Sequence, residues 1–463
     1  MSLMLNALRG VALSVGTGAV VFAAETAAAA TEVAATVAPV APAAPVFDTG
    51  NTAWVLMSAV LVLFMTVPGL ALFYAGLVRT KNALGIVTQC FAIACLVTVL
   101  WTAYGYSLAF SDAGQVAGQF SWGSIIGGLD KAFLWNVTPT TFAAQASTIP
   151  EPVFFFFQLT FAIITPALLV GAFAERMKFS AILWLSALWL TFIYCPICHM
   201  AWGGPASLMG GLWGLQDTAG GTVVEVNSGI AGLVCAIMVG RRLGYPKQAM
   251  LPHNAIMCVT GASMLWVGWF GFNAGSAVAA DGLAARCAYT TQIAGAMAGC
   301  SWMAVEWFKT GKPGAVGIAT GVVAGLVAIT PACGFVGPVG AMIIGACAGV
   351  ASFLFITQVK RKFGFDDSLD VMGVHGVGGM IGLIGTGIFA TTALMGVGYA
   401  QGQTMGGQVL VQLSSMVLTI AVSGIGTAII LFVLDKTIGL RVSDDDQEAG
   451  LDYIQHGENA YNH

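Results

Sequence analysis

The chain has 463 residues, of which 57% are apolar and only 8% are charged, and its formal net charge is -4. Soluble domains carry roughly 25% charged residues, so this composition excludes an ordinary soluble protein and predicts a polytopic protein of the lipid bilayer. The basic residues form no patch suited to nucleic acid. The ten cysteines are scattered, mostly through apolar runs, which predicts small packing residues and not a disulfide framework.

The amino-terminal segment has the pattern of a secretory signal. Residues 1–24 contain one basic residue, Arg9, followed by a short apolar run and then small residues. A first transmembrane helix is the alternative, but the run is shorter than the roughly 20 residues that a span needs. We therefore predict a signal peptide over 1–24, cleaved between residues 23 and 30. Residues 25–50 are mainly Ala, Thr, Val and Pro, which predicts a disordered or extended leader.

Eleven long apolar runs follow in the part of the chain from residue 51 to residue 434, and we predict that each is a transmembrane helix. They lie near 52–78, 83–110, 152–174, 180–202, 222–240, 253–275, 285–307, 315–333, 336–359, 371–393 and 408–434. The predicted fold class is an all-α polytopic membrane protein. The odd number suggests two sets of five helices plus one extra helix, with a tail over 435–463.

Basic residues indicate how these helices are oriented. If the helices alternate in direction, fourteen of the 17 basic residues fall on one side: Arg79, Lys81, Arg176, Lys178, Arg241, Arg242, Lys247, Lys309, Lys312, Lys360, Arg361, Lys362, Lys436 and Arg441. Lys131 and Arg286 fall on the other side, and Arg9 lies in the leader. The positive-inside rule then places the carboxyl tail in the cytoplasm and the mature amino terminus outside.

Two of the predicted spans begin with a titratable side chain among small residues. Thr222–Gly232 opens the fifth span and carries Glu225, and Asp370–Gly379 opens the tenth span and carries His375. Ionisable groups are costly at bilayer depth and usually face a bundle interior or a pathway. Because these two spans run in opposite directions, they predict two halves of one site, as in an inverted-repeat transporter. The alternatives are a coincidence of position and a purely structural role for Glu225.

Eight motifs, in order and spacing, resemble those of the ammonium transporter family (Amt/Mep/Rh), most closely its bacterial Amt branch. They are Phe73–Arg79, Tyr104–Phe110, Ala174–Arg176, His199–Gly204, Asp217–Val224, Gly268–Ser276, Thr330–Gly334 and Asp370–Gly379. The resemblance covers the chain from about residue 50 to the end. It implies a homotrimer in the inner (plasma) membrane, with one narrow pore per subunit for ammonium-derived nitrogen. It also implies a transporter and not an enzyme.

The resemblance implies an outer recruitment site formed by Trp202, Phe157 and Ser276, which Asp217 organises. Aromatic faces attract cations most strongly when the cation is partly desolvated, and Ser276 would accept a hydrogen bond from the ion. Plainer alternatives exist for two of these residues. Trp202 at a span end could be an interfacial anchor, and Asp217 before a Gly-Gly turn could be a helix cap.

The resemblance also implies a gate and a pore pair. Phe161 and Phe272 match two stacked phenylalanines that close the outer mouth in the family, although packing is the usual role of such residues. At position 225 the chain departs from the usual pattern, since most members have a second histidine there and glutamate is known in a fungal subset. An acid beside His375 should titrate as a coupled pair with it. We therefore predict that Glu225 and His375 pass a proton inward while ammonia crosses, which makes transport electrogenic.

Two other functions stay open at this point: a passive ammonia channel of the Rh type, and an ammonium sensor that acts through a cytoplasmic partner. Gly450–Tyr461 resembles the family's tail, which in bacteria packs under the subunits and meets a PII-type regulatory protein. A solvated, disordered end is the alternative. Methylammonium is a further candidate substrate.

One motif points elsewhere. Cys195–His199 spells C-x-x-C-H, the pattern of covalent haem attachment. It lies inside the fourth predicted span, where a haem pocket has no room, and the family has a proline and a histidine at the same place. We interpret the two cysteines as packing residues and predict no cofactor and no metal site.

Overall fold

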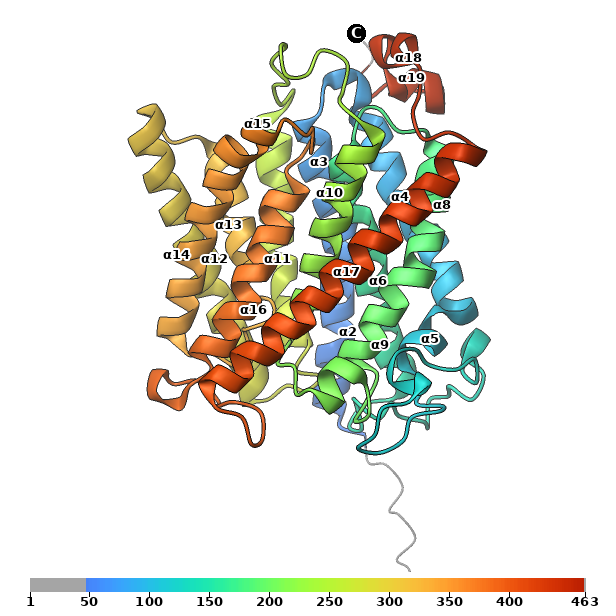
Figure 1. Cartoon of the computed structure of the whole chain (residues 1–463), viewed down its shortest axis with the longest axis vertical. Helices are drawn as coiled ribbons and strands as arrows, with labels where there is room; N and C mark the ends of the chain where they lie inside the picture. Colours follow the sequence, from blue (N-terminus) through green and yellow to red (C-terminus); the bar gives the residue numbers. More distant parts are fainter. Residues whose placement is uncertain (1–46, 462–463) are drawn as a thin grey trace, which may run out of the picture. The chain divides into compact units, whose positions relative to one another are not determined.

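The computed structural model describes residues 47–461, so the predicted signal peptide (1–24) and nearly all of the predicted leader (25–50) lie outside the described residues. Between residues 47 and 461 every regular element is a helix, which confirms the predicted all-α fold class (Figure 1). The first helix begins at Thr49. The Asp48 carboxylate accepts a hydrogen bond of 2.7 Å from the backbone N–H of Asn51, which satisfies a donor that the helix end leaves free.

The first five spans are each built from more than one helical piece. They comprise α2 (Thr49–Phe64), η1 (Met65–Leu70) and α3 (Ala71–Leu77); η2 (Thr80–Asn82), α4 (Ala83–Leu100), η3 (Trp101–Gly105) and α5 (Tyr106–Phe110); α6 (Glu151–Leu168) and α7 (Val170–Phe173); α8 (Phe179–Trp189), η6 (Leu190–Tyr194) and α9 (Cys195–Trp202); and η8 (Gly221–Val226) with α10 (Asn227–Val239). Short helices η4 (Trp122–Ser124), η5 (Ala132–Leu134) and η7 (Leu208–Leu212) lie in the loops between them.

The second set of helices follows in the same way. It comprises α11 (Ala255–Gly275); α12 (Gly282–Thr310); α13 (Ala315–Ile329); α14 (Pro338–Leu354), η9 (Phe355–Val359) and α15 (Lys360–Phe363); and η10 (Met372–Gly376) with α16 (Val377–Phe389). After η11 (Thr392–Leu394), α17 (Met405–Thr437) crosses the bundle at a slant and contacts α8, α10 and α16 (Figure 1). The tail forms α18 (Asp444–Ala449) and α19 (Leu451–His456).

Each of the eleven predicted runs coincides with a helix in this part of the chain. Nine of the helices in residues 47–461 are long and apolar enough to cross a membrane by themselves. The other two are α12, which is 29 residues long but includes Arg286, Glu306 and Lys309, and α13, which has only 15 residues. The number of eleven crossings therefore stays a prediction. Figure 1 shows the first five spans on one side of the bundle and the next five on the other, with α17 across both.

The fifth and tenth spans begin in the same way at opposite ends of the bundle. Asp217 lies eight residues before Glu225, and its carboxylate accepts hydrogen bonds from the first backbone N–H groups of the fifth span. Asp367 lies eight residues before His375, and its carboxylate accepts from the N–H groups of Val371 and Met372 at 3.1 and 2.8 Å. This repeated construction at opposite ends is consistent with two inverted halves of one fold.

Buried ion pairs hold together the end of the bundle where the basic residues gather. Glu175, on the turn between α7 and α8, faces Arg79 at 3.1 Å and Arg242 at 3.4 Å, and Arg242 also pairs with Asp366 at 2.8 Å. Burial opposes the ionisation of Glu175, but the guanidinium groups of Arg242 and Arg79 outweigh it and hold the pKa of Glu175 below its ordinary value. The network therefore ties together four loops that are far apart in the sequence.

The tail is docked on this same end and is not a free extension. Asn82 accepts a hydrogen bond from the backbone N–H of Leu451 at 2.9 Å. The Asp452 carboxylate accepts from the N–H groups of Leu84 and Gly85 at 3.0 and 2.6 Å, at the start of α4. Figure 1 shows α18 and α19 beside the beginning of that span. The tail is thus tied to the loop before α4 and to the start of that helix.

We predict that Glu175→Gln lowers the melting temperature of the purified protein by about 3 °C or more at neutral pH, since it leaves buried guanidinium groups without their partner. The native pKa of Glu175 lies below its unfolded value, so its contribution is fully present above the unfolded pKa and is lost as the pH falls through the native pKa. The difference between variant and parent should therefore shrink in acid.

Thermal unfolding in detergent, followed by tryptophan fluorescence across a pH series, measures this difference. Asp435→Asn is the control, because Asp435 is half exposed and makes only a loose 4.0 Å pair with Lys436. Equal melting temperatures of Glu175→Gln and its parent at neutral pH would show that the ion pairs do not hold this end.

Candidate functional site

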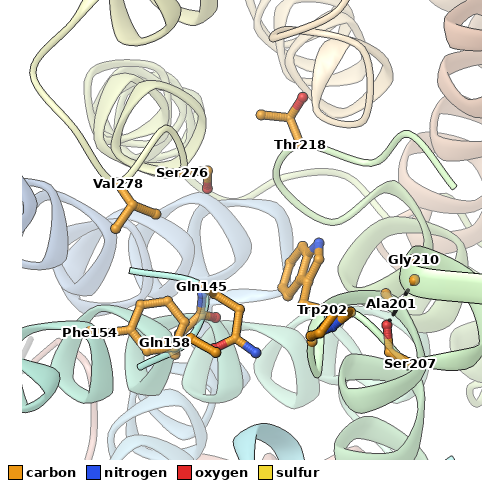
Figure 2. A pocket seen from close by; sticks show the side chains of 14 residues that line it. Gln145, Phe154, Gln158, Ala201, Trp202, Ser207, Gly210, Thr218, Ser276 and Val278 are labelled. Carbon is orange, nitrogen blue, oxygen red and sulfur yellow. Dashed lines mark hydrogen bonds between the residues drawn. The ribbon is translucent and has the colours of Figure 1, made fainter. Parts of the chain in front are cut away.

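A cavity of about 390 Å³ opens at the end of the bundle where α9 ends, and Figure 2 shows it from close by. Trp202, Ser276 and Thr218 line it together with Phe154 and Gln158. Among the described residues no charged side chain lines this cavity. A cation that enters it is therefore met by an aromatic face and by neutral oxygen atoms.

Trp202 and Ser276, two of the predicted recruitment residues, lie at helix ends that face this cavity. Trp202 is the last residue of α9, and its indole Nε1 donates to the backbone oxygen of Asp217 at 3.1 Å. The hydroxyl of Ser276 donates to the backbone oxygen of Phe272 at 2.7 Å, so its lone pairs remain available as acceptors. The indole of Trp202 is therefore held by a hydrogen bond within the protein. An interfacial anchor would not need such a bond.

Asp217 lies behind this cavity and does not line it. Its carboxylate accepts hydrogen bonds from the backbone N–H groups of Gly220, Gly221 and Thr222 at 2.7 to 2.9 Å and from the Thr222 hydroxyl at 2.6 Å. Burial raises the pKa of the Asp217 carboxyl, while these four donors favour its charged form. The geometry is that of a helix cap, and the backbone oxygen of the same residue accepts the hydrogen bond from Trp202.

Phe157, the third predicted recruitment residue, also lies away from the cavity. Its side chain is fully buried, with its ring 5.0 Å from that of Phe161. Phe154, one helical turn earlier, and Gln158 reach the cavity in its place. The sequence reasoning missed Gln158 and Gln145, which also lines the cavity. The signal that could have found Gln158 is an amide inside an otherwise apolar span.

Phe161 and Phe272 separate the outer cavity from the interior. Their ring centroids are 4.3 Å apart with a tilt of 34°, and the ring of Phe161 meets that of Trp202 edge-on at 6.1 Å. Both phenylalanines are almost fully buried. The two predicted gate residues therefore lie together, directly behind Trp202, between the outer cavity and the interior of the bundle.

Behind these rings lies a second, much smaller cavity of about 10 Å³, roughly the size of one water-sized probe. Among the described residues that line this cavity, Glu225 and His375 alone are ionisable, and the rest of the wall is apolar. His375 Nδ1 lies 2.7 Å from Glu225 Oε2, and the two side chains are almost fully buried. The two residues predicted to form one site are thus in direct contact, each inside a π-helical turn of its span.

Glycine makes this contact possible. A Cβ atom on Gly229 would lie 2.2 Å from the backbone nitrogen of Gly376, and one on Gly379 would lie 2.8 Å from the Cβ of Glu225. These two glycines come four residues after Glu225 and four residues after His375. Any side chain at either position would push the two half-spans apart and lengthen the Glu225–His375 hydrogen bond.

The C-x-x-C-H motif has a structural use. His199 is fully buried, with Nδ1 at 3.0 Å from the backbone oxygen of Ala109 and Nε2 at 2.7 Å from that of Gly123. Cys195 and Cys198 are buried too. The imidazole ties α9 to the loop after α5 and so supports the helix end that carries Trp202.

Comparisons with known proteins agree with this arrangement. The model of the Ammonium Transporter Family matches residues 53–461. The chain belongs to this family. It is 45% identical to an ammonium transporter of Aquifex aeolicus over 90% of this chain and 94% of that protein, and 41% identical to an ammonium transporter of Bacillus subtilis over 89% and 98%.

Solved structures of family members share the fold. The crystal structure of Saccharomyces cerevisiae Mep2 matches with a TM-score of 0.76 and 33% identity, covering 86% of this chain and 91% of that one. A structure titled Sensor Amt Protein matches with a TM-score of 0.79 and 28% identity over 88% and 98%. As a member of this family of ammonium transporters, the chain is a membrane protein and its homologues are transporters.

We predict that Asp217→Ala lowers the melting temperature by about 3 °C, because it removes four hydrogen bonds and leaves the N–H groups at the start of the fifth span unpaired. Asp217→Asn keeps one side-chain oxygen as acceptor and should recover part of the loss. Thermal unfolding without ammonium measures both variants. A melting temperature of Asp217→Ala equal to that of the parent would contradict the role of a helix cap.

Proposed function

We propose that this protein moves ammonium-derived nitrogen across the inner (plasma) membrane and moves one positive charge with it. Ammonium is recruited at the outer cavity by Trp202, Phe157, Ser276 and Asp217, and it loses a proton on passing Phe161 and Phe272. Ammonia then crosses the apolar lumen. The observation that carries the proposal is the hydrogen bond of 2.7 Å between Glu225 and His375, the ionisable pair of that lumen.

The recruitment step follows from the chemistry of the outer cavity. Ammonium is strongly hydrated, so a selective site has to replace part of its water shell before the narrow segment. The indole of Trp202 offers a π-face and the lone pairs of Ser276 offer an acceptor. Phe157 and Asp217 contribute indirectly. Phe157 packs on Phe161, and Asp217 holds the loop that positions Trp202.

The relay step follows from the geometry of the pair. With Glu225 ionised, His375 Nδ1 carries the hydrogen that bridges to Oε2, so Nε2 remains to accept or release a proton. The direct hydrogen bond between the two side chains gives a proton a short path from one to the other. A proton can therefore follow the pair while neutral ammonia follows the apolar wall, and net charge moves inward.

Orientation, assembly and regulation belong to the same proposal. The loops rich in Lys and Arg and the docked tail face the cytoplasm, and the outer cavity faces the opposite side. Three subunits assemble as a homotrimer in the bilayer, each with its own pore, and methylammonium is a second substrate. A PII-type regulatory protein binds at the cytoplasmic face, where the tail contacts the start of the second span.

Ammonium sensing is a second candidate function, because the tail is held against the pore-bearing bundle and one similar structure is titled Sensor Amt Protein. A sensor would bind ammonium at the outer cavity and alter the tail without much flux. A passive ammonia channel of the Rh type would give flux without charge. Measurements of current and uptake on the same preparation distinguish these functions.

We predict a transient inward current when ammonium is applied to reconstituted protein on a supported membrane, and we expect this current to saturate with ammonium concentration. Asp217→Ala should remove it, because the loop whose backbone oxygen accepts from Trp202 loses the four hydrogen bonds that the carboxylate accepts. Uptake without current would point to neutral ammonia conduction. Binding without uptake or current would point to a sensor.

We predict that Glu225→Gln reduces the current by about 10-fold or more, because the amide cannot take up or release the proton while it keeps the shape of the carboxyl group. Glu225→His should retain current but shift its pH dependence, since two imidazoles replace an acid–base pair. Current recorded over a range of external pH tests both. An unchanged current and an unchanged pH dependence in Glu225→His would contradict the proton relay.

A further inference from the structure

Two glutamine side chains of the outer cavity carry oxygen atoms that have no donor. Gln158 on α6 and Gln145 on the preceding loop both line the cavity, and Figure 2 draws them between Phe154 and Trp202. The Oε1 atoms of both are buried and accept no hydrogen bond from any described residue. Gln158 as a residue is only 8% exposed.

Such atoms need an explanation, because a buried acceptor without a partner costs free energy that native proteins seldom leave unrecovered. No described residue donates a hydrogen bond to the Oε1 atom of either amide, so no donor fixes the direction in which that oxygen atom points. Rotation about χ3 can turn either end toward the cavity. The two amides are therefore free to present their oxygen atoms to a ligand that brings its own donors.

Two of the three hydroxyl groups in the lining have the same bias toward acceptors, and the third, that of Ser207, accepts from the backbone N–H of Gly211 at 3.1 Å. The hydroxyl of Ser276 donates to Phe272 at 2.7 Å, and that of Thr218 donates to the backbone oxygen of Pro331 at 3.2 Å. Both hydrogens are thus used inside the protein, and lone pairs are what these hydroxyls can offer. A cavity lined by acceptors and an indole face, with no charged side chain among its described residues, suits a small cation that donates N–H bonds.

We propose that Gln145 and Gln158 form an acceptor pair that binds ammonium or a primary alkylammonium ion in the outer cavity. The inference rests on the proposed function and adds a second recognition element to it. The indole face of Trp202 attracts any cation of suitable size, whereas the amide oxygens accept hydrogen bonds only from a ligand that carries N–H donors. The pair therefore favours ammonium over an alkali cation such as K⁺, which the indole face alone would discriminate poorly.

Gln158→Met and Gln145→Met test the pair, because each replaces the amide by an apolar group of similar length. We expect Gln158→Met to raise the ammonium concentration that half-saturates uptake by roughly tenfold, and Gln145→Met to raise it severalfold. Neither variant should be less stable than the parent without ammonium, since each removes an unpaired buried oxygen. The stabilisation that ammonium adds to the melting temperature should shrink in both, while that added by K⁺ should not change.

Gln89→Met is the matched control. Gln89 on α4 also carries a buried Oε1 without a donor, but it does not line the outer cavity. It should leave the half-saturating concentration unchanged. If both cavity variants behave like Gln89→Met while Trp202→Leu raises the half-saturating concentration, the amides hold only water and the inference is wrong. If the parent itself shows no saturable ammonium uptake or binding, the proposed function fails first.

Discussion

The hydrogen bond between Glu225 and His375 is the contact on which the rest of the structure depends. Two ionisable groups lie at bilayer depth, 2.7 Å apart and almost fully buried. Neither could remain there alone without a large desolvation cost. Their contact requires two half-spans to cross closely, and this crossing requires glycine at 229 and 379. The contact of Glu225 with His375 and the close packing of the two half-spans therefore depend on the same glycines.

The same requirement extends to both ends of the bundle. The position of the polar residue in each half-span depends on where that half-span begins. Asp217 and Asp367 set the first residue of the two half-spans, because their carboxylates accept hydrogen bonds from the first N–H groups. On the side of Asp217, the cap also holds Trp202 against the outer cavity. On the side of Asp367, the neighbouring Asp366 joins the ion-pair network under which the tail is docked. The outer cavity, the Glu225–His375 contact and the end of the bundle that holds the tail are thus linked through these two carboxylates.

Much of this could be predicted from the sequence, because the length and apolarity of a run indicate a helix, and an ionisable residue inside such a run marks a position that needs a buried partner. The apolar runs located the helices, and the contact of Glu225 with His375 followed from their matched positions. What hydropathy does not report is the direction of a side chain. Phe157 was expected at the cavity, but its ring is buried against that of Phe161, while Gln158, the next residue, lines the cavity. The shortness of α13 also lay outside the reach of a hydropathy argument, because the apolar run continues beyond Ile329 into a turn.

Infrared difference spectroscopy of the reconstituted protein, recorded while ammonium is added and removed, tests the central claim most directly because it observes the carboxyl group itself. The account predicts a carboxyl C=O band that changes with ammonium, that shifts in heavy water and that is absent in Glu225→Gln. A band that persists in Glu225→Gln, or a spectrum without any carboxyl change during transport, would contradict the proton relay through Glu225.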